Sequence, residues 1–73
     1  MRASYDKLWK LLIDKKMNKT ELKEVSGISF NVLAKMGKND VVSMDSLMKI
    51  CCVLNCGVAD VIEFLPEENE HNV

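Results

Sequence analysis

Apolar residues recur at helical spacing near the start of the chain. Positions 5, 8, 9, 11, 12 and 13 are apolar, and Ser4 in front of them can cap a helix. At about 100° per residue these side chains span roughly 200° of the helix surface, which is more than the stripe a surface helix buries. We expect the surplus residues, Trp9, Leu12 and Ile13, to pack beneath the C-terminal segment or to contact a second subunit.

Two short helices with a glycine corner between them are predicted next. The stretch "NKTE" (residues 18–21) matches a capping box, in which Asn18 caps the helix and Glu21 reaches back to it. Gly27 follows where a left-handed residue ends this helix, because glycine takes a positive φ without steric cost. Ser29 then caps a third helix that runs to about Met36.

The second half of the chain is predicted to hold two more helices. After a polar loop at residues 37–40, Ser43 can cap the segment "MDSLMKICCVLN", and Gly57 ends it. The apolar stripe of this helix comprises Leu47, Ile50, Cys51 and Leu54. A last short helix, "VADVIEF" (residues 58–64), stops before Pro66. Because no stretch alternates convincingly enough to predict a strand, the pattern indicates an all-α fold of five short helices.

Length and composition fit one small domain. The 73 residues are 48% hydrophobic and 29% charged, which is typical of a folded chain. We assign residues 1–66 to this domain and expect residues 67–73 to form an acidic, disordered tail. No apolar run approaches the roughly 18 residues of a membrane span, and charged residues come too early for a secretory signal. We therefore expect a cytoplasmic protein with no membrane partner.

The cysteines and the histidine give little indication of catalysis or metal binding. Cys51, Cys52 and Cys56 are clustered and odd in number, which favours reduced, buried thiols over disulfides. His71 lies in the polar tail, where it can neither complete a zinc site nor act as the base for a cysteine nucleophile. The sequence also offers no carboxylate pair on a predicted cleft and no glycine-rich phosphate loop. We expect no metal, no cofactor, no small-molecule ligand and no enzymatic activity.

Charge is distributed unevenly along the chain. Residues 1–38 carry nine Lys and Arg against four Asp and Glu, whereas residues 39–73 carry one against seven. Such an asymmetry indicates one surface that suits a polyanion. An accidental distribution of ordinary, solvated surface charge is the alternative.

The order of the helices resembles a known family of regulators. A second helix, a glycine corner and a third helix form a helix-turn-helix. Five residues fall on the interior positions of such a unit: Leu22, Gly27, Ile28, Leu33 and Met36. The segment "MNKTELKEVSGISFNVLAKM" resembles the core of the Cro/CI-type (XRE) regulators of phages and bacteria, and "SMDSLMKICCVLNCGVADVIEF" resembles their fourth and fifth helices. The resemblance runs from about Lys7 to Ile62 and implies a lambda-repressor-like DNA-binding domain.

The third helix has two chemically different sides in a helical projection. Its core side carries Val32, Leu33 and Met36. Its other side carries Asn31, Ala34, Lys35 and Lys38, with Phe30 at the edge. Asparagine can pair with adenine, lysine can donate to guanine, and an apolar side chain can meet a thymine methyl group.

The resemblance implies double-stranded DNA as the partner and assigns contacts to individual residues. Base contacts are implied for Phe30, Asn31 and Lys35. Contacts with the DNA backbone are implied for Lys19, Thr20, Ser29, Lys38 and Asn39. Each has a plain alternative, since the lysines and Asn31 can be ordinary solvated side chains and Phe30 can turn inward as core.

Two features depart from the pattern of the family. Lys23 occupies the fifth position of the second helix, where a small residue is usual, so we expect its stem to lie on the neighbouring helix while its ammonium group reaches solvent. The net charge of −1 is not basic, which predicts weak non-specific affinity for DNA.

We expect a sequence-specific DNA-binding transcriptional regulator, and more specifically a repressor that inserts residues 29–36 in the major groove. A protein-interaction module of the same fold, such as an antitoxin or an anti-repressor partner, is the alternative. The wide apolar face of the first helix would suit that role. A homodimer is a further expectation, with Trp9, Ile13 and Phe64 as candidates for its interface.

Overall fold

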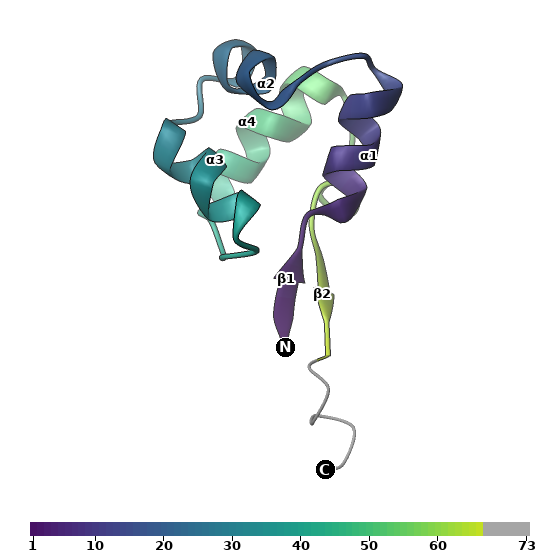
Figure 1. Cartoon of the computed structure of the whole chain (residues 1–73), viewed down its shortest axis with the longest axis vertical. Helices are drawn as coiled ribbons and strands as arrows, with labels where there is room; N and C mark the ends of the chain where they lie inside the picture. Colours follow the sequence, from purple (N-terminus) through teal and green to yellow (C-terminus); the bar gives the residue numbers. More distant parts are fainter. Residues whose placement is uncertain (67–73) are drawn as a thin grey trace.

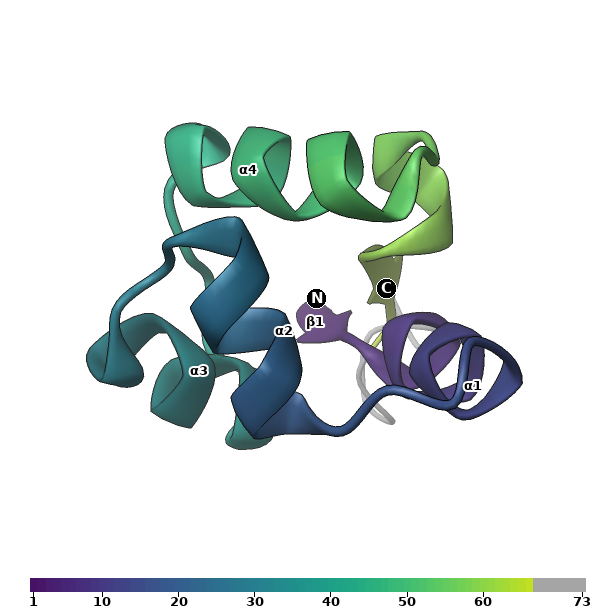
Figure 2. The same ribbon diagram turned by 90° about the horizontal axis from the view of Figure 1, so that it is seen from above.

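A computed structural model describes residues 1–66 as four α-helices with a short two-stranded sheet (Figures 1 and 2). The helices are α1 (Asp6–Asp14), α2 (Lys19–Ser26), α3 (Phe30–Gly37) and α4 (Met44–Leu54). A one-turn 3-10 helix, η1 (Val58–Asp60), follows α4, and the strands β1 (Arg2–Ser4) and β2 (Glu63–Leu65) lie at the two ends. In Figure 1, α2 and α3 meet at a tight corner, α1 lies across from them, and the sheet projects below the helices.

The predicted starts of α2, α3 and α4 are confirmed by side-chain caps. Asn18 Oδ1 accepts a hydrogen bond from the backbone N–H of Glu21 (2.7 Å), and the Glu21 carboxylate accepts one from the N–H of Asn18 (3.1 Å). Ser29 Oγ and Ser43 Oγ each accept a hydrogen bond at 3.2 Å from the N–H three residues further along. Each cap satisfies an amide that the first turn of a helix leaves without an intrahelical partner.

Two predicted helix boundaries are wrong. Ser4 belongs to β1, so Tyr5 takes the N-cap position of α1 and makes no side-chain cap bond. At the other boundary, α4 ends at Leu54 because Asn55 adopts the left-handed conformation (φ +52°), which asparagine tolerates better than most residues. Gly57, the predicted end, has φ −88° and lies beyond the helix.

The prediction of a fifth α-helix over residues 58–64 is wrong, as is the expectation of no strands. Val58–Asp60 forms a single 3-10 turn, and Glu63–Leu65 pairs antiparallel with β1, so that Ala3 lies opposite Phe64. Pairing with a distant partner outweighs the helical pattern in a segment that is rich in β-branched and aromatic residues. Residues 1–66 remain mostly helical, so the helical class is confirmed but the number of helices is not.

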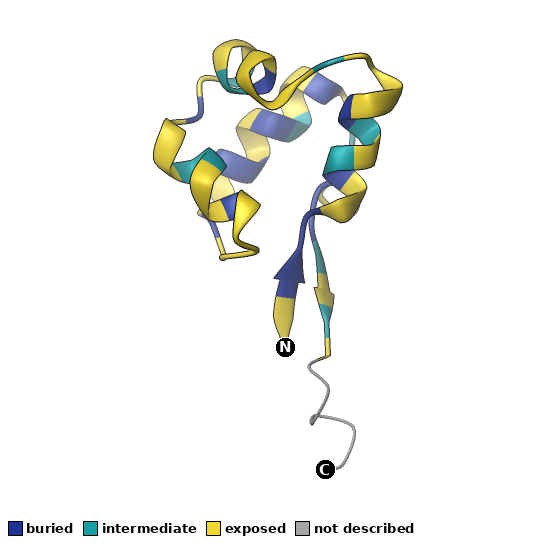
Figure 3. Cartoon of the chain, in the orientation of Figure 1, coloured by how far each residue is buried: buried dark blue, intermediate teal, exposed yellow. Residues whose placement is uncertain are grey.

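The core joins the helix-turn-helix to the elements around it (Figure 3). Leu22 of α2, Ile28 of the corner and Met36 of α3 are each at most 4% exposed. They belong to one cluster with Ala3, Tyr5, Leu8, Leu12, Val42, Leu47, Ile50, Leu54, Val61 and Ile62. Because burial of apolar area is the main source of stability, this shared core fixes α2 and α3 relative to α1 and α4.

The three residues of α1 that were predicted to exceed its buried stripe have three different environments. Leu12 is buried, Trp9 is half-buried, and Ile13 is 74% exposed. The cysteine prediction is also right only in part. Cys51 and Cys56 are half-buried, whereas Cys52 is exposed, and all three are free thiols.

Three further predictions concern membrane-spanning helices, metal sites and the C-terminal tail. Within residues 1–66, no helix is long and apolar enough to cross a bilayer. The same part of the chain gathers no group of three or more metal-ligating side chains. The predicted tail at residues 67–73, with His71, lies outside the described residues.

Candidate nucleic-acid interface

Helix α3 turns one side to the core and the other to solvent (Figure 3). Met36 is fully buried, and Val32 and Leu33 are half-buried against the core. The solvent side exposes Phe30, Asn31, Ala34 and Lys35. Phe30 is 68% exposed, so the alternative in which it turns inward as core is wrong.

Short-range bonds and one buried residue hold the corner that orients α3. Gly27 has φ +79°, the left-handed conformation that was predicted for it. Ser26 Oγ donates to the carbonyl oxygen of Leu22 (2.6 Å) and accepts from the N–H of Ile28 (3.4 Å). Ile28 is 4% exposed and anchors the corner in the core. The direction of α3 is therefore fixed by local backbone conformation together with burial.

The residues predicted to contact the DNA backbone lie at helix ends and are exposed. Two are in the first turn of α2, one is the N-cap of α3, and two follow α3. They are Lys19, Thr20, Ser29, Lys38 and Asn39. Exposure is what a phosphate contact requires, and the contact itself stays a prediction.

The turn after α3 is tied to the start of α1. Tyr5 is buried, and its Oη donates to the carbonyl oxygen of Asp40 at 2.6 Å. Asn39 next to it has φ +60°. Burial raises the pKa of Tyr5 above 10.0, while a backbone hydrogen bond from Val42 lowers it and the Asp40 carboxylate raises it further. The phenol therefore keeps its proton, and stays a donor, at neutral pH.

Lys19 lies against an aromatic ring. Its Nζ is 4.2 Å from the centroid of the Trp9 ring, which is within the range of a cation–π contact. Trp9 is in turn tilted against Tyr5, with ring centroids 6.5 Å apart and an interplanar angle of 47°. The contact between Trp9 and Lys19 could not be predicted from the sequence, because the two residues belong to different helices. The hydrogen bond of Tyr5 did have a signal in the sequence, because a tyrosine on the buried side of a helix usually needs a hydrogen-bond partner for its hydroxyl group.

Lys35 and Lys38 carry charge that no carboxylate among the described residues neutralises by direct pairing. Within residues 1–66, no ion pair joins either lysine to a carboxylate, whereas Lys7 Nζ lies 3.7 Å from the Glu63 carboxylate. Lys23 is half-buried, as expected for a lysine whose stem lies on protein. The two exposed cations at and after the end of α3 are therefore available to an anionic partner.

This arrangement of a capped α2, a left-handed glycine corner and a half-exposed α3 matches a defined family. Residues 7–67 match the family described as the Cro/C1-type HTH DNA-binding domain. This chain belongs to that family. A crystal structure of the transcriptional regulator VanUg (Form II) is 56% identical in sequence, with a TM-score of 0.87 over 90% of this chain and 88% of that chain. A comparison with curated proteins found no match. The family identifies a DNA-binding domain, and the similar structure is that of a transcriptional regulator.

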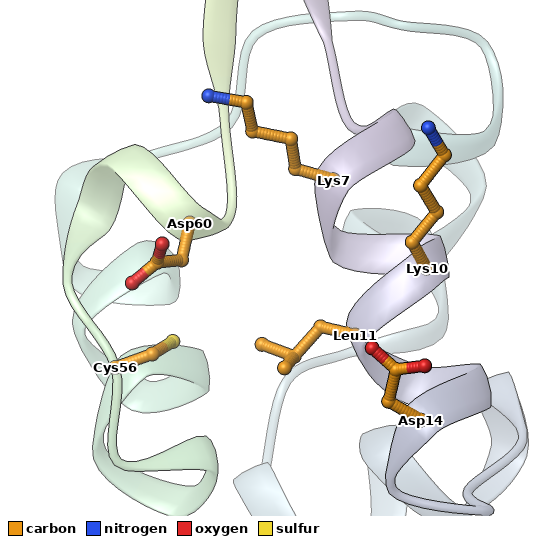
Figure 4. Close-up of a pocket in the computed structure, with 6 residues that line it drawn as sticks. All are labelled: Lys7, Lys10, Leu11, Asp14, Cys56 and Asp60. Atoms are coloured by element: carbon orange, nitrogen blue, oxygen red, sulfur yellow. The ribbon is translucent and has the colours of Figure 1, made fainter.

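The Cro/C1-type domain also has a hollow between α1 and η1 (Figure 4). Its volume is about 420 Å³, and it is lined by Lys7, Lys10, Leu11, Asp14, Cys56 and Asp60. Burial raises the pKa of the Cys56 thiol, and the neighbouring Cys51 thiol raises it further. A raised pKa leaves little thiolate at neutral pH, so Cys56 lacks the character of a nucleophile.

Proposed function

We propose that this protein is a sequence-specific DNA-binding repressor that inserts α3 in the major groove. The main support is the exposed side of α3, which presents Asn31, Ala34 and Lys35 while its other side is fixed in the core. Repression is the simplest outcome for so small a domain, because its occupancy of a promoter excludes other proteins from the same DNA. With DNA as its ligand, we expect the protein in the compartment that holds DNA.

The dimensions of an α-helix suit the groove. With its side chains a helix is about 10–12 Å across, close to the approximately 12 Å width of the major groove, and the eight residues of α3 extend about 12 Å along its axis. Asn31 and Lys35 are one turn apart, or about 6 Å along the helix axis, so they would address base pairs about two steps apart. Ala34 between them is small enough to let the helix approach the base edges. Phe30 would lie against a thymine methyl group.

The flanking residues would position the helix. Lys19 and Thr20 would contact phosphates from the start of α2, and Lys38 and Asn39 would do so from the turn after α3. Each phosphate that a lysine neutralises contributes about −0.9 to the slope of log affinity against log salt. Lys19 and Lys38 together therefore predict about −1.8 per protomer, a shallow slope.

We also propose that two copies bind neighbouring half-sites, whose centres lie about one helical turn apart in proteins of this architecture. Of the three interface candidates, Ile13 and Phe64 are 74% and 59% exposed. Trp9 is the weaker candidate, because Lys19 already lies over its ring. Light scattering at tens of micromolar should detect a dimer with DNA; a monomer both with and without DNA would contradict this assignment.

Charge reversal at Lys35 tests the groove assignment. The duplex is one recovered by selection from a random-sequence library, and affinity is measured by fluorescence anisotropy. Lys35→Glu removes a base contact of about 1–3 kcal/mol and adds repulsion from phosphates, so affinity should fall by about 100-fold or more. The melting temperature should stay unchanged, since the side chain is exposed.

Lys10→Glu is the matched control, an exposed lysine on α1 that lines the hollow of Figure 4. It should bind the selected duplex nearly as well as the parent protein. Parental affinity in Lys35→Glu would overturn the placement of α3. If selection enriches no duplex at all, the protein-interaction module becomes the better interpretation.

A further inference from the structure

The two ends of the helix-turn-helix are each held by one member of an aromatic pair, Tyr5 and Trp9. We propose that Trp9, packed on Tyr5, is a positioning residue for DNA binding: its ring holds the Lys19 ammonium group at the start of α2, while Tyr5 holds the turn after α3. The pair would thereby keep the two phosphate-contact segments at a fixed separation. This inference rests on the proposed function, because it assigns a role within DNA binding.

The contact between Lys19 and Trp9 restricts a side chain that is otherwise flexible. A solvated lysine samples many rotamers and loses that freedom when it contacts a phosphate. With Nζ 4.2 Å from the ring centroid, Lys19 has already given up part of the freedom in the unbound protein. Binding then requires less ordering, which is the general advantage of a preorganised contact.

The Trp9 ring is itself held in place. Trp9 is half-buried and packs against the core cluster, and it tilts on Tyr5, which is fully buried. The first turn of α2 is fixed independently by the reciprocal hydrogen bonds of Asn18 and Glu21. Both the ring and the backbone that carries Lys19 are therefore set before any ligand arrives.

The second segment is fixed through the partner ring. Tyr5 Oη donates to the carbonyl oxygen of Asp40 at 2.6 Å, across 35 positions of sequence. Asp40 closes the turn that carries Lys38 and Asn39, since its N–H donates to the Lys35 carbonyl oxygen at 2.9 Å. The start of α2 and the turn after α3 are thus connected through the side chains of Trp9 and Tyr5, whose rings are tilted against each other.

A double-mutant cycle separates positioning from ordinary packing. Trp9→Leu, Lys19→Gln and the double variant are titrated with the selected duplex between 50 and 200 mM salt. One phosphate contact accounts for about a 3.5-fold change of affinity over this range, from a slope of about −0.9. Each single variant should lose up to that much salt dependence, and the double variant should lose no more than Lys19→Gln alone.

Three further variants sharpen the cycle. Trp9→Phe keeps an aromatic face and should restore part of the salt dependence. Tyr5→Phe should weaken DNA binding while leaving the Lys19 ammonium group over the Trp9 ring. Lys10→Gln, an exposed lysine elsewhere on α1, should behave additively with Trp9→Leu.

A measurement without DNA tests the contact itself. The side-chain protons of Lys19 should show an upfield ring-current shift in the NMR spectrum of the free protein, lost in Trp9→Leu and partly kept in Trp9→Phe. No such shift in the parent protein would overturn the proposal, as would additive effects of Trp9→Leu and Lys19→Gln on affinity. If the parent protein binds no duplex, both the proposed function and this proposal fail. An NMR shift that is nevertheless present would show that the contact between Lys19 and Trp9 exists and that the failure lies in the proposed function.

Discussion

Exchange of Gly27 for alanine isolates the backbone strain at the helix-turn-helix corner. Gly27 has φ +79°, and a Cβ added there would meet no heavy atom within 4 Å. Steric contact therefore contributes nothing, and only the conformational preference of the backbone changes. The left-handed region costs an L-residue about 1–2 kcal/mol. Alanine recovers about 0.4–1 kcal/mol by making the unfolded chain less flexible, so the net destabilisation should be about 1 kcal/mol.

Gly37 provides a matched control in α3. A Cβ added there also meets no heavy atom within 4 Å, but its φ is not positive. The same exchange should therefore stabilise the protein by about 0.5–1 kcal/mol, because glycine is a poor helix former. In a domain of this size about 1 kcal/mol shifts the melting temperature by about 4–8 °C. Gly27→Ala should melt below the parent protein and Gly37→Ala above it.

Thermal melts followed by circular dichroism, together with urea titrations, would measure both shifts. Gly27→Asn should fall between the parent and Gly27→Ala, since asparagine tolerates the left-handed region. An unchanged melting temperature in Gly27→Ala, or shifts of the same sign at both glycines, would refute the reasoning. The corner would then not depend on a left-handed backbone.

Two other predictions concern the cap of α2 and the buried phenol. Asn18→Ala should lower the free energy of unfolding, measured by urea titration, by about 1 kcal/mol, because the N–H of Glu21 loses its acceptor. Thr20→Ala, at an exposed position of the same helix, is the control and should change it little. Equal effects of the two exchanges would argue against the cap. The folded-state pKa of Tyr5 is raised above 10.0, so its contribution to stability is complete below about pH 10 and is lost as the pH rises through the folded-state pKa. Stability should therefore fall more steeply above about pH 10 in the parent than in Tyr5→Phe, and parallel urea profiles would count against it.

The helix-turn-helix could be predicted from the sequence because its signals are local. The capping box joins Asn18 to a residue three positions away, and Ser29 and Ser43 act over the same distance. Gly27 ends α2 through its own backbone conformation. The exposure of Asn31 likewise followed from the helical period of α3. Each inference needed only neighbours within one turn.

The ends of the chain could not be predicted in this way. The segment that follows η1 has a pattern compatible with a helix, and it becomes a strand only because β1 lies beside it. Ser4, a plausible cap, is drawn into the same pairing. The contacts of Trp9 with Lys19 and of Tyr5 with Asp40 also join different elements, so they arise from packing that no sequence window contains.

The antiparallel pairing of β1 with β2 has a mechanical consequence. Arg2 lies opposite Leu65, so the outermost pair of the sheet joins the two ends of the described chain. Tension applied between Met1 and Pro66 would load the pairs one after another, as in a zipper, and would part them before the helices bear any force. The peeling would then reach buried Ile62 and continue inward from both ends, leaving α2 and α3, central in the sequence, to yield last.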